Sequence, residues 1–388
     1  MRAVVVLIAL AISAFTYVTT ETLPIGLLLL ISADLNVSQA AVGLLVTCYG
    51  LVVVVTSVPL THLTRRVPRR VLLPALLAAF VVFTVVSVAT TSYWLLLAAR
   101  MAIALSQALF WSVVVPTAAS LFPPKVTGRA LAVVFAGSSL AAVVGVPVGT
   151  WLGDQLGWQA AFLSLTGLGV LTLVVIAALL PSGRPEQAHS ARGSTPDGRR
   201  YWLLMAATTL TVTGSFTAFT YVTPFLTEVA TFSATAIGPL LLLRGIAGVA
   251  GVGIGGVHVD RSPWGATVTP VALQVVALLG VYVFGDSPVL AAGLVALAGL
   301  AFSAFAGAIG TRMLQVAPGS TDLASAGSST AFNVGITSGA LLGGILLSTV
   351  GVRTTALAGG LLSLAGLAVA LAERLLPAPE IARATAVP

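Results

Sequence analysis

Apolar stretches of about 20 residues alternate with short polar segments along most of the chain. A bilayer core about 30 Å thick needs about 20 apolar residues for one helical crossing, and a helix satisfies its backbone polar groups internally. The stretches lack the two-residue alternation of a lipid-facing barrel strand. The pattern therefore predicts twelve membrane-spanning helices, at about 4–31, 40–62, 71–91, 94–117, 130–152, 159–181, 201–226, 235–257, 267–285, 289–313, 325–349 and 354–376.

A polar segment, PSGRPEQAHSARGSTPDGRR from Pro181 to Arg200, separates the first six stretches from the last six. It has no apolar face to bury, so we expect a flexible cytoplasmic linker. The predicted all-α membrane protein has a six-helix bundle at 1–181, a linker at 182–200, a second six-helix bundle at 201–376 and a cytoplasmic tail at 377–388.

The two halves repeat one another. Ser38 and Gly43 recur as Ser233 and Gly238 at an offset of about 195 residues. At nearly the same offset, three glycines of the first half are matched in the second: Gly145, Gly149 and Gly157 by Gly339, Gly343 and Gly351. Halves repeated in this parallel sense place a substrate site between them near the middle of the membrane, and they alternate access by rocking. The sequence therefore predicts two pseudo-symmetric bundles.

Composition supports the membrane assignment, and charge orients the chain. Of 388 residues, 58% are hydrophobic and only 7% are charged, whereas soluble domains carry roughly a quarter charged residues. The net charge of +7 does not indicate a nucleic-acid partner, because the basic residues lie in short segments between apolar stretches. Arg and Lys gather on one side of the predicted topology, which marks that side as cytoplasmic. We expect a multi-pass plasma-membrane protein with both termini in the cytoplasm.

Three charged residues lie inside the predicted helices and more than one turn from either end: Glu21, Arg100 and Arg244. A charge at that depth costs at least about 2.5 to 3.5 kcal/mol, so each needs a compensating partner or a function. Burial and a nearby guanidinium act in opposite directions on the proton affinity of a carboxyl group. Glu21 is therefore a candidate proton-coupling group, with Arg100 or Arg244 as its partner. The alternative is a static buried pair that fixes helix packing.

Two loops at repeat-related positions carry basic clusters. The first reads THLTRRVPRR and ends at Arg70, and the second reads GVHVDR and ends at Arg261. They resemble the G-x-L-A-D-R-x-G-R-R signature of the major facilitator superfamily, although Arg65 replaces the expected Asp and Pro68 the second Gly in the first copy. The resemblance implies a conformational gate of Arg66, Arg69, Arg70, Asp260 and Arg261. Topological anchoring alone is the alternative.

The fifth stretch contains GVPVG, with Gly145, Pro147 and Gly149. It resembles the fifth-helix antiporter motif of proton-coupled drug exporters, whereas close helix packing by small residues is the plain alternative. With TETLPIGLL in the first stretch, the resemblance is to the twelve-helix drug:proton antiporter branch, including sugar-, arabinose- and chloramphenicol-efflux permeases, and it covers nearly the whole chain. Arg100 resembles the fourth-helix arginine of the R-x-x-x-G motif, with Ala104 in place of the glycine. The resemblance implies a coupling role for Arg100. The alternative is that its side chain simply snorkels to the membrane surface.

The family fold places its first, fourth, seventh and tenth helices around the substrate cleft. Residues of this chain near mid-span, with Arg244, are then candidates for the substrate site or gate: Tyr17, Gln107, Phe110, Trp111, Phe216, Phe219 and Tyr221. Aromatic walls with a few polar groups suit moderately apolar ligands. Each residue is also compatible with a core or lipid-facing position. Two amides, Gln274 and Asn333, are expected to hydrogen-bond between helices.

The resulting hypothesis is a secondary active transporter that exports a small organic molecule in exchange for protons. A proton-independent uniporter or importer and a nontransporting membrane receptor are the alternatives. Sugars, chloramphenicol-like drugs and nucleosides remain open as substrates. No phosphate-binding glycine loop, paired carboxylates or metal-ligand spacing points to an enzyme. We expect no cofactor, no metal and no nucleic acid, with substrate, protons and lipid as the partners of a monomer.

Overall fold

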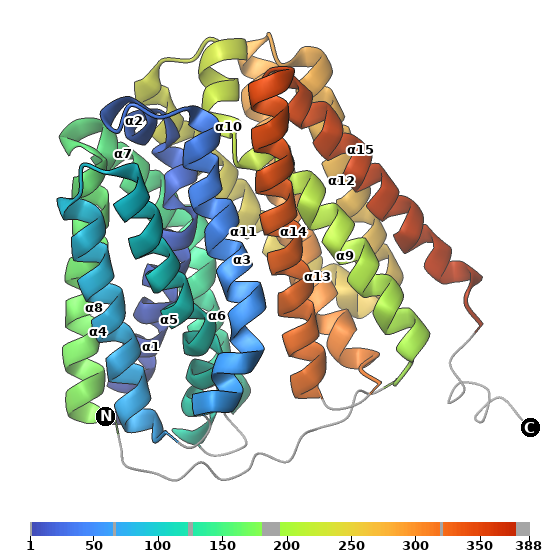
Figure 1. Ribbon diagram of the computed structural model, residues 1–388. Coiled ribbons are helices and arrows are strands. Elements are labelled where there is room, and N and C mark those ends of the chain that lie inside the picture. Colours follow the sequence, from blue (N-terminus) through green and yellow to red (C-terminus); the bar gives the residue numbers. More distant parts are fainter. Residues whose placement is uncertain (1, 65–66, 123–126, 181–194, 319–320, 378–388) are drawn as a thin grey trace, which may run out of the picture. The chain divides into compact units, whose positions relative to one another are not determined.

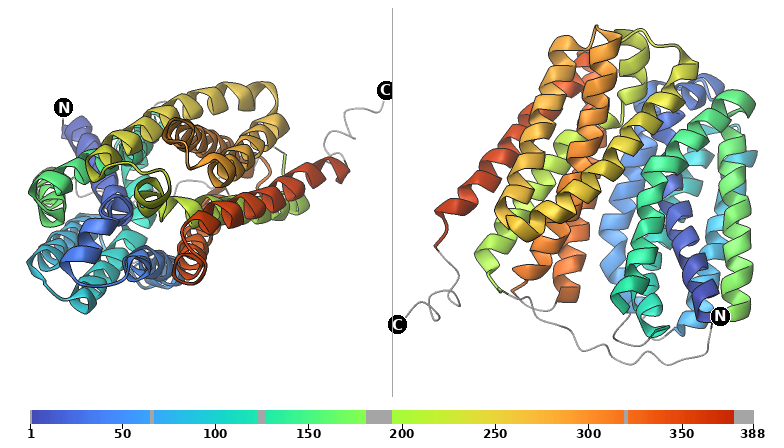
Figure 2. Two further views of the ribbon diagram at one scale, coloured as in Figure 1. Left: turned by 90° about the horizontal axis from the view of Figure 1, so that it is seen from above. Right: turned by 180° about the vertical axis from the view of Figure 1, so that it is seen from behind.

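The computed structural model describes residues 2–64, 67–122, 127–180, 195–318 and 321–377. Within these ranges the chain is helical between short connections and has no strand (Figure 1). It divides into two compact units, in each of which the long helices lie side by side (Figure 2). The first unit comprises Met1–Ala188 and Ser233–Leu242, and the second comprises His189–Phe232 and Leu243–Pro388. The predicted all-α membrane fold is confirmed.

The first unit is built from α1 (Arg2–Gly26), α2 (Leu28–Asp34), α3 (Gln39–Thr64), α4 (Arg69–Ala89), α5 (Tyr93–Ser120), α6 (Thr127–Leu140), a π-helical turn (Ala141–Gly145), α7 (Val146–Leu156) and α8 (Trp158–Leu179). Helix α1 packs against α6 and α8, while α5 packs against α3 and α4. The sequence assigns Ser233–Leu242 to the second bundle, but a Cβ added to Gly238 would lie 3.4 Å from Cβ of Trp151 in α7, and this segment groups with the first unit.

The second unit is built from α9 (Gly198–Phe219), α10 (Val222–Pro224), a π-helical turn (Phe225–Val229), α11 (Ile237–Arg261), α12 (Pro263–Phe284), α13 (Pro288–Gln315), α14 (Thr321–Thr349), α15 (Arg353–Ala372) and a 3₁₀ turn (Glu373–Leu375). Helix α9 packs against α14 and α15, and α12 packs against α13 and α15. Gln274 of α12 joins three of these helices, because its Nε2 donates to the carbonyl of Thr211 (2.9 Å) and to Ser363 Oγ (2.8 Å). The prediction for Gln274 is confirmed, whereas the bond of Asn333 shown among the described residues stays within its own helix, to Ser329.

Twelve helical segments of the described residues are long and apolar enough to cross a membrane, and each overlaps a predicted stretch. The first differs from the prediction, because α1 ends at Gly26 and the chain resumes as α2 after Leu27. Pro24 lies in the last turns of α1, where it provides no backbone N–H to the helix. Glu21 therefore lies within two turns of the end of α1 instead of about ten residues from a helix end.

Glycines of the fifth span let α1 approach closely. A Cβ on Gly145 would overlap the side chain of Thr19, and one on Gly149 would lie 2.6 Å from Leu23 Cδ1. Just before α7 the helix widens into a π turn, in which the N–H of Val146 donates to the carbonyl of Ala141. Pro147, which has no N–H, follows this turn at the start of α7. Gly145 and Gly149 of the predicted motif thus lie against the second half of α1, and an antiporter role for the motif stays a prediction.

Candidate functional site

Glu21 is the carboxyl group of a buried hydrogen-bond chain in the first unit. The side chain is 8% exposed, and its Oε2 accepts from Nε2 of Gln107 in α5 at 2.6 Å. Oε1 of Gln107 in turn accepts from the hydroxyl of Tyr49 in α3 at 2.7 Å. Three helices are therefore linked through one glutamine, and any change in the charge of Glu21 acts directly on that amide.

Arg100 reaches α1 through its main chain. The residue is 1% exposed, and its Nη1 and Nη2 donate to the carbonyl oxygens of Thr20 (3.0 Å) and Glu21 (3.1 Å). In a regular helix the carbonyl of Thr20 would accept from residue 24, but that residue is Pro24 and has no N–H. Arg100 therefore supplies the donor that the proline removes.

No ion pair joins Arg100 to the Glu21 carboxylate among the pairs of the described residues. The guanidinium lies 5.2 Å from the ring centroid of Tyr49 and 5.9 Å from that of Phe162, both within cation–π range. The two predicted coupling residues thus lie together, because Arg100 binds the backbone oxygens of Thr20 and Glu21 and also contacts Tyr49, which reaches the Glu21 carboxyl through Gln107. Whether they couple transport to protons stays a prediction.

The other candidates of the first unit pack against each other and against α4. Tyr17 is fully buried, and its ring centroid lies 4.9 Å from that of Phe80 and 4.6 Å from that of Phe110. The Tyr17 hydroxyl donates to the carbonyl of Leu76 at 3.0 Å. Trp111 is half-buried and stacks on Phe135. Tyr17 and Phe110 hold core positions, which is the alternative that the sequence left open.

In the second unit, aromatic candidates cluster around α9. The ring of Phe216 lies 5.8 Å from those of Phe219 and Phe302. Tyr221 is buried and donates through its hydroxyl to the carbonyl of Ala340 at 3.0 Å. Arg244 of α11 places its guanidinium carbon 3.7 Å from the ring centroid of Phe219. Phe219 and Arg244 also line a cavity of this unit, whereas Phe216 and Tyr221 do not.

The side chains of Arg66, Asp260 and Arg261, three of the five predicted gate residues, lie outside the description of the structure. Arg66 lies outside the described residues, and Asp260 and Arg261 end α11 with side chains that are likewise outside the description. Arg69 and Arg70 are the first two residues of α4. The gate therefore stays a prediction.

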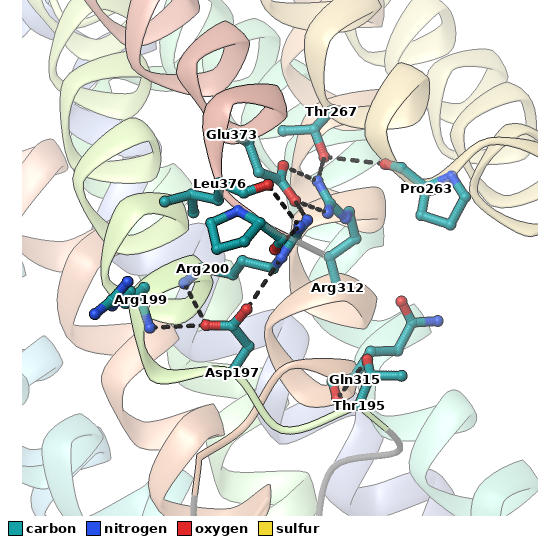
Figure 3. A network of polar contacts seen from close by, with 11 residues as sticks. Thr195, Asp197, Arg199, Arg200, Pro263, Thr267, Arg312, Gln315, Glu373 and Leu376 are labelled. Carbon is teal, nitrogen blue, oxygen red and sulfur yellow. Dashed lines mark hydrogen bonds and ion pairs between the residues drawn. The ribbon is translucent and has the colours of Figure 1, made fainter. Parts of the chain in front are cut away.

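Sequence reasoning missed a buried ionic network in the second unit (Figure 3). Glu373, which is 1% exposed, accepts from both Arg312 of α13 and Arg200 of α9. Arg200 also donates to Asp197, whose carboxylate caps the first turn of α9. Nη1 of Arg312 further donates to Thr267 of α12. The available signal was that these charges lie at ends of predicted helices on one side of the topology.

Among the described residues, no three His, Cys, Asp or Glu side chains come close enough to hold a metal ion. The site is therefore described by hydrogen bonds, buried charge and aromatic contacts alone.

The helical architecture, with spans enough for twelve crossings and charges inside them, is that of a polytopic membrane transporter. The chain belongs to the Major Facilitator Superfamily, whose family model matches residues 10–321. The family resemblance noted in the sequence is thus confirmed.

Relatives and solved structures agree with this assignment. The chain is 32% identical over 340 residues to a probable sugar efflux transporter of Helicobacter acinonychis (strain Sheeba), covering 87% of each chain. It is 34% identical over 353 residues to the uncharacterized MFS-type transporter YtbD of Bacillus subtilis (strain 168), covering 89% of each. Two solved structures share the fold at low identity. A bacterial homologue of the human lysosomal transporter Spinster, inward-facing and unoccupied, matches with a TM-score of 0.74 at 16% identity, over 96% of this chain and 97% of the other. The human organic anion transporter MFSD10 (TETRAN) matches with a TM-score of 0.69 at 15% identity, over 95% of this chain and 98% of the other.

Proposed function

We propose that this transporter exports a small organic molecule, a sugar or related metabolite or a drug, in exchange for protons by alternating access. The observation that carries the proposal is the Glu21 carboxyl, which is buried in the membrane-spanning part of α1 and bound by an amide without a carboxylate–guanidinium pair. A carboxyl held in this way can gain and lose a proton without first breaking an ion pair. Because the H. acinonychis relative is named a probable sugar efflux transporter, sugars are the first substrate class to test.

In the proposed cycle, Glu21 takes up a proton from the outside and releases it to the cytoplasm while substrate moves outward. Each elementary charge that moves inward contributes about 2.3 kcal/mol per 100 mV of membrane potential. Protonation turns a carboxylate that only accepts hydrogen bonds into a group that also donates one. Gln107 meets such a donor by turning its amide oxygen toward Glu21, and this turn reverses the Gln107–Tyr49 hydrogen bond between α5 and α3, because the Tyr49 hydroxyl must then accept from the amide N–H. The amide thereby passes the protonation state of α1 to a third helix.

The test compares Glu21→Gln with the wild-type protein in proteoliposomes that carry an internal pH dye. Sugars, amphenicols and nucleosides are added in turn under an imposed pH gradient. We expect substrate-dependent proton flux in the wild type and its loss in Glu21→Gln, because the amide cannot exchange a proton. Asp34→Asn is the matched control, since Asp34 is an exposed carboxyl of the same unit, and it should retain full flux.

Flux that neither the gradient nor Glu21→Gln changes would reject proton antiport and favour the uniporter. Protons that move in the same direction as the substrate would favour an importer. If a compound of the panel binds but does not move across the membrane, the receptor alternative gains support.

The proposal includes a monomer in the plasma membrane with both termini in the cytoplasm. The support for this orientation is the distribution of Arg and Lys, which in short loops favours retention on the cytoplasmic side.

A further inference from the structure

Arg374 and Trp264 lie together at one end of the second unit. Trp264 is the second residue of α12, and Arg374 belongs to the 3₁₀ turn that follows α15. The guanidinium carbon of Arg374 lies 3.5 Å from the ring centroid of Trp264, which is within cation–π range. Both residues stand at the ends of segments that are long and apolar enough to cross a membrane, Pro263–Phe284 and Arg353–Leu375. They therefore lie at the depth of the membrane–water interface, where tryptophan is enriched.

The turn that carries Arg374 is held from inside the unit. The preceding residue, Glu373, is buried and accepts from Arg312 and Arg200 (Figure 3). Nη2 of Arg200 also donates to the carbonyl of Pro377 at 3.0 Å. Arg374 is exposed, so it extends outward from a segment whose position is fixed on both sides.

No carboxylate pairs with Arg374 in the part of the chain that the structure describes. The opposite end of the same two helices provides a comparison. There Arg353 of α15 lies 5.7 Å from the ring centroid of Tyr282 in α12, and Nη2 of Arg353 lies 2.8 Å from Oδ2 of Asp286. Each end has an arginine beside an aromatic ring, but only at Arg353 does the described chain supply the anion.

The surroundings of Arg374 indicate what kind of anion fits. The ring of Trp264 covers one face of the guanidinium and leaves its edge, which carries the N–H donors, for a ligand. Such an edge binds phosphate oxygens through two parallel hydrogen bonds. Farther into the span, Leu371 and Leu364 are exposed on α15, and their spacing of seven residues places them on one side of the helix. A ligand that fits both features has an anionic phosphate and hydrocarbon chains.

We propose that Arg374 and Trp264 bind the headgroup of an anionic phospholipid such as phosphatidylglycerol. The phosphate lies on the edge of Arg374, and the acyl chains lie along Leu371 and Leu364. A zwitterionic lipid fits less well, because its own cation lies near the guanidinium. The site is contained in one unit and shares no residue with the candidate substrate site or with the Glu21 chain. The proposal goes beyond proton-coupled export and does not depend on it.

The test measures lipid binding next to Trp264 in the purified full-length protein, reconstituted in phosphatidylcholine vesicles. Phosphatidylglycerol with brominated acyl chains is added in increasing fraction, because bromine quenches tryptophan fluorescence on contact. The chain has six tryptophans, so the signal of Trp264 is the difference between the wild type and Trp264→Phe. Brominated phosphatidylcholine, titrated in the same way, gives the reference affinity.

We expect phosphatidylglycerol to bind next to Trp264 about fivefold more strongly than phosphatidylcholine, as one arginine near the membrane surface should give. In Arg374→Gln, measured against its own Trp264→Phe reference, this preference should disappear. Arg374→Lys keeps the charge but not the planar fork, so it should retain a smaller preference.

Arg353→Gln is the matched control, because it removes the arginine at the opposite end of α12 and α15. It should leave the preference at Trp264 unchanged. Glu380→Gln removes the acidic residue of the segment beyond Pro377, and it should also change nothing. Inorganic phosphate should not compete, because it has no hydrocarbon to lie along Leu371.

Equal binding of the two lipids in the wild type would overturn the proposal, and so would an unchanged preference in Arg374→Gln. A stronger preference in Glu380→Gln would assign the edge of Arg374 to that carboxylate instead. Competition by inorganic phosphate would make the site one for a soluble anion, and either outcome rejects the lipid. The measurement involves neither substrate nor a proton gradient, so its failure leaves proton-coupled export untouched.

Discussion

Replacing Pro24 with alanine returns a backbone N–H to α1 at the position that faces the carbonyl of Thr20. In the wild type this carbonyl accepts from Nη1 of Arg100 at 3.0 Å. In Pro24→Ala the helix itself supplies a donor, so the contribution of Arg100 should fall. A double-mutant cycle with Arg100→Leu measures that dependence directly.

The expected magnitude follows from the hydrogen bond at stake. In the wild-type background, Arg100→Leu leaves a buried carbonyl without this donor, which costs about 1–3 kcal/mol. In the Pro24→Ala background that cost disappears, while the loss of the other Arg100 contacts stays the same. Membrane double-mutant cycles give about 0.6 kcal/mol on average and at most about 1.7 kcal/mol for one hydrogen bond. We therefore expect a coupling free energy of about 1–1.5 kcal/mol, with the smaller loss in the Pro24→Ala background.

The assay is reversible unfolding of the four proteins in mixed micelles at increasing fractions of SDS, with the free energy of unfolding compared at one composition. Pro74→Ala is the matched control for the proline. Pro74 also lies inside a helix of the first unit, but the N–H that it lacks would donate to the carbonyl of residue 70 in α4, which is not the carbonyl that Arg100 binds. Arg100→Leu should have the same effect on the free energy of unfolding in the wild-type and Pro74→Ala backgrounds.

An Arg100→Leu effect that is equal in the wild-type and Pro24→Ala backgrounds, within about 0.3 kcal/mol, would show that Arg100 does not replace the N–H that Pro24 lacks. Coupling of similar size to Pro74→Ala would also refute this role of Arg100, because the effect would then be a general response to restored helix hydrogen bonds.

Three further predictions concern packing, buried charge and topology. Gly149→Leu should destabilise the protein by about 1–3 kcal/mol through overlap with α1, whereas Gly167→Ala, which has open space around it, should lie within about 0.5 kcal/mol of wild type in the same unfolding assay. Glu373→Ala should cost about 3–5 kcal/mol because it leaves the buried guanidinium of Arg312 unpaired, against at most about 1 kcal/mol for Asp286→Ala in an exposed pair. In a Cys-free background, a membrane-impermeant maleimide should label Asp286→Cys in intact cells and Arg199→Cys only after lysis, and the reverse pattern would contradict cytoplasmic termini.

The fold was predictable because each membrane-spanning helix corresponds to an apolar stretch that is visible in the sequence. The thickness of the bilayer core sets the length of each apolar stretch, so the approximate bounds of a helix do not depend on which other helices it contacts. Even the break of the first span has a sequence signal, since Pro24 and Gly26 stand near the point where α1 gives way to α2. What the apolar pattern cannot specify is which helix face meets which neighbour.

The candidate site shows this limit in particular residues. A charge inside a span is visible in the sequence, so Glu21 and Arg100 were found, but their partners depend on helix rotation and on side-chain reach. The sequence presents Gln107 only as a candidate cleft residue and gives no signal for Tyr49, although these two residues form the hydrogen-bond chain that leads from Glu21. Glu373 was missed because the reasoning favoured charges near mid-span over those at helix ends.

Arg100 and Arg244 show why a buried arginine does not by itself indicate a carboxylate partner. A proline inside a helix releases a backbone carbonyl, and an arginine on a neighbouring helix can use that oxygen in place of an acid. Arg100 does so, with Pro24 following Thr20 by one helical turn. Arg244 has neither such a carbonyl nor a carboxylate within the described residues, but it lines a cavity that Arg100 does not. The same residue type is thus part of the helix architecture in one unit and a candidate for ligand binding in the other.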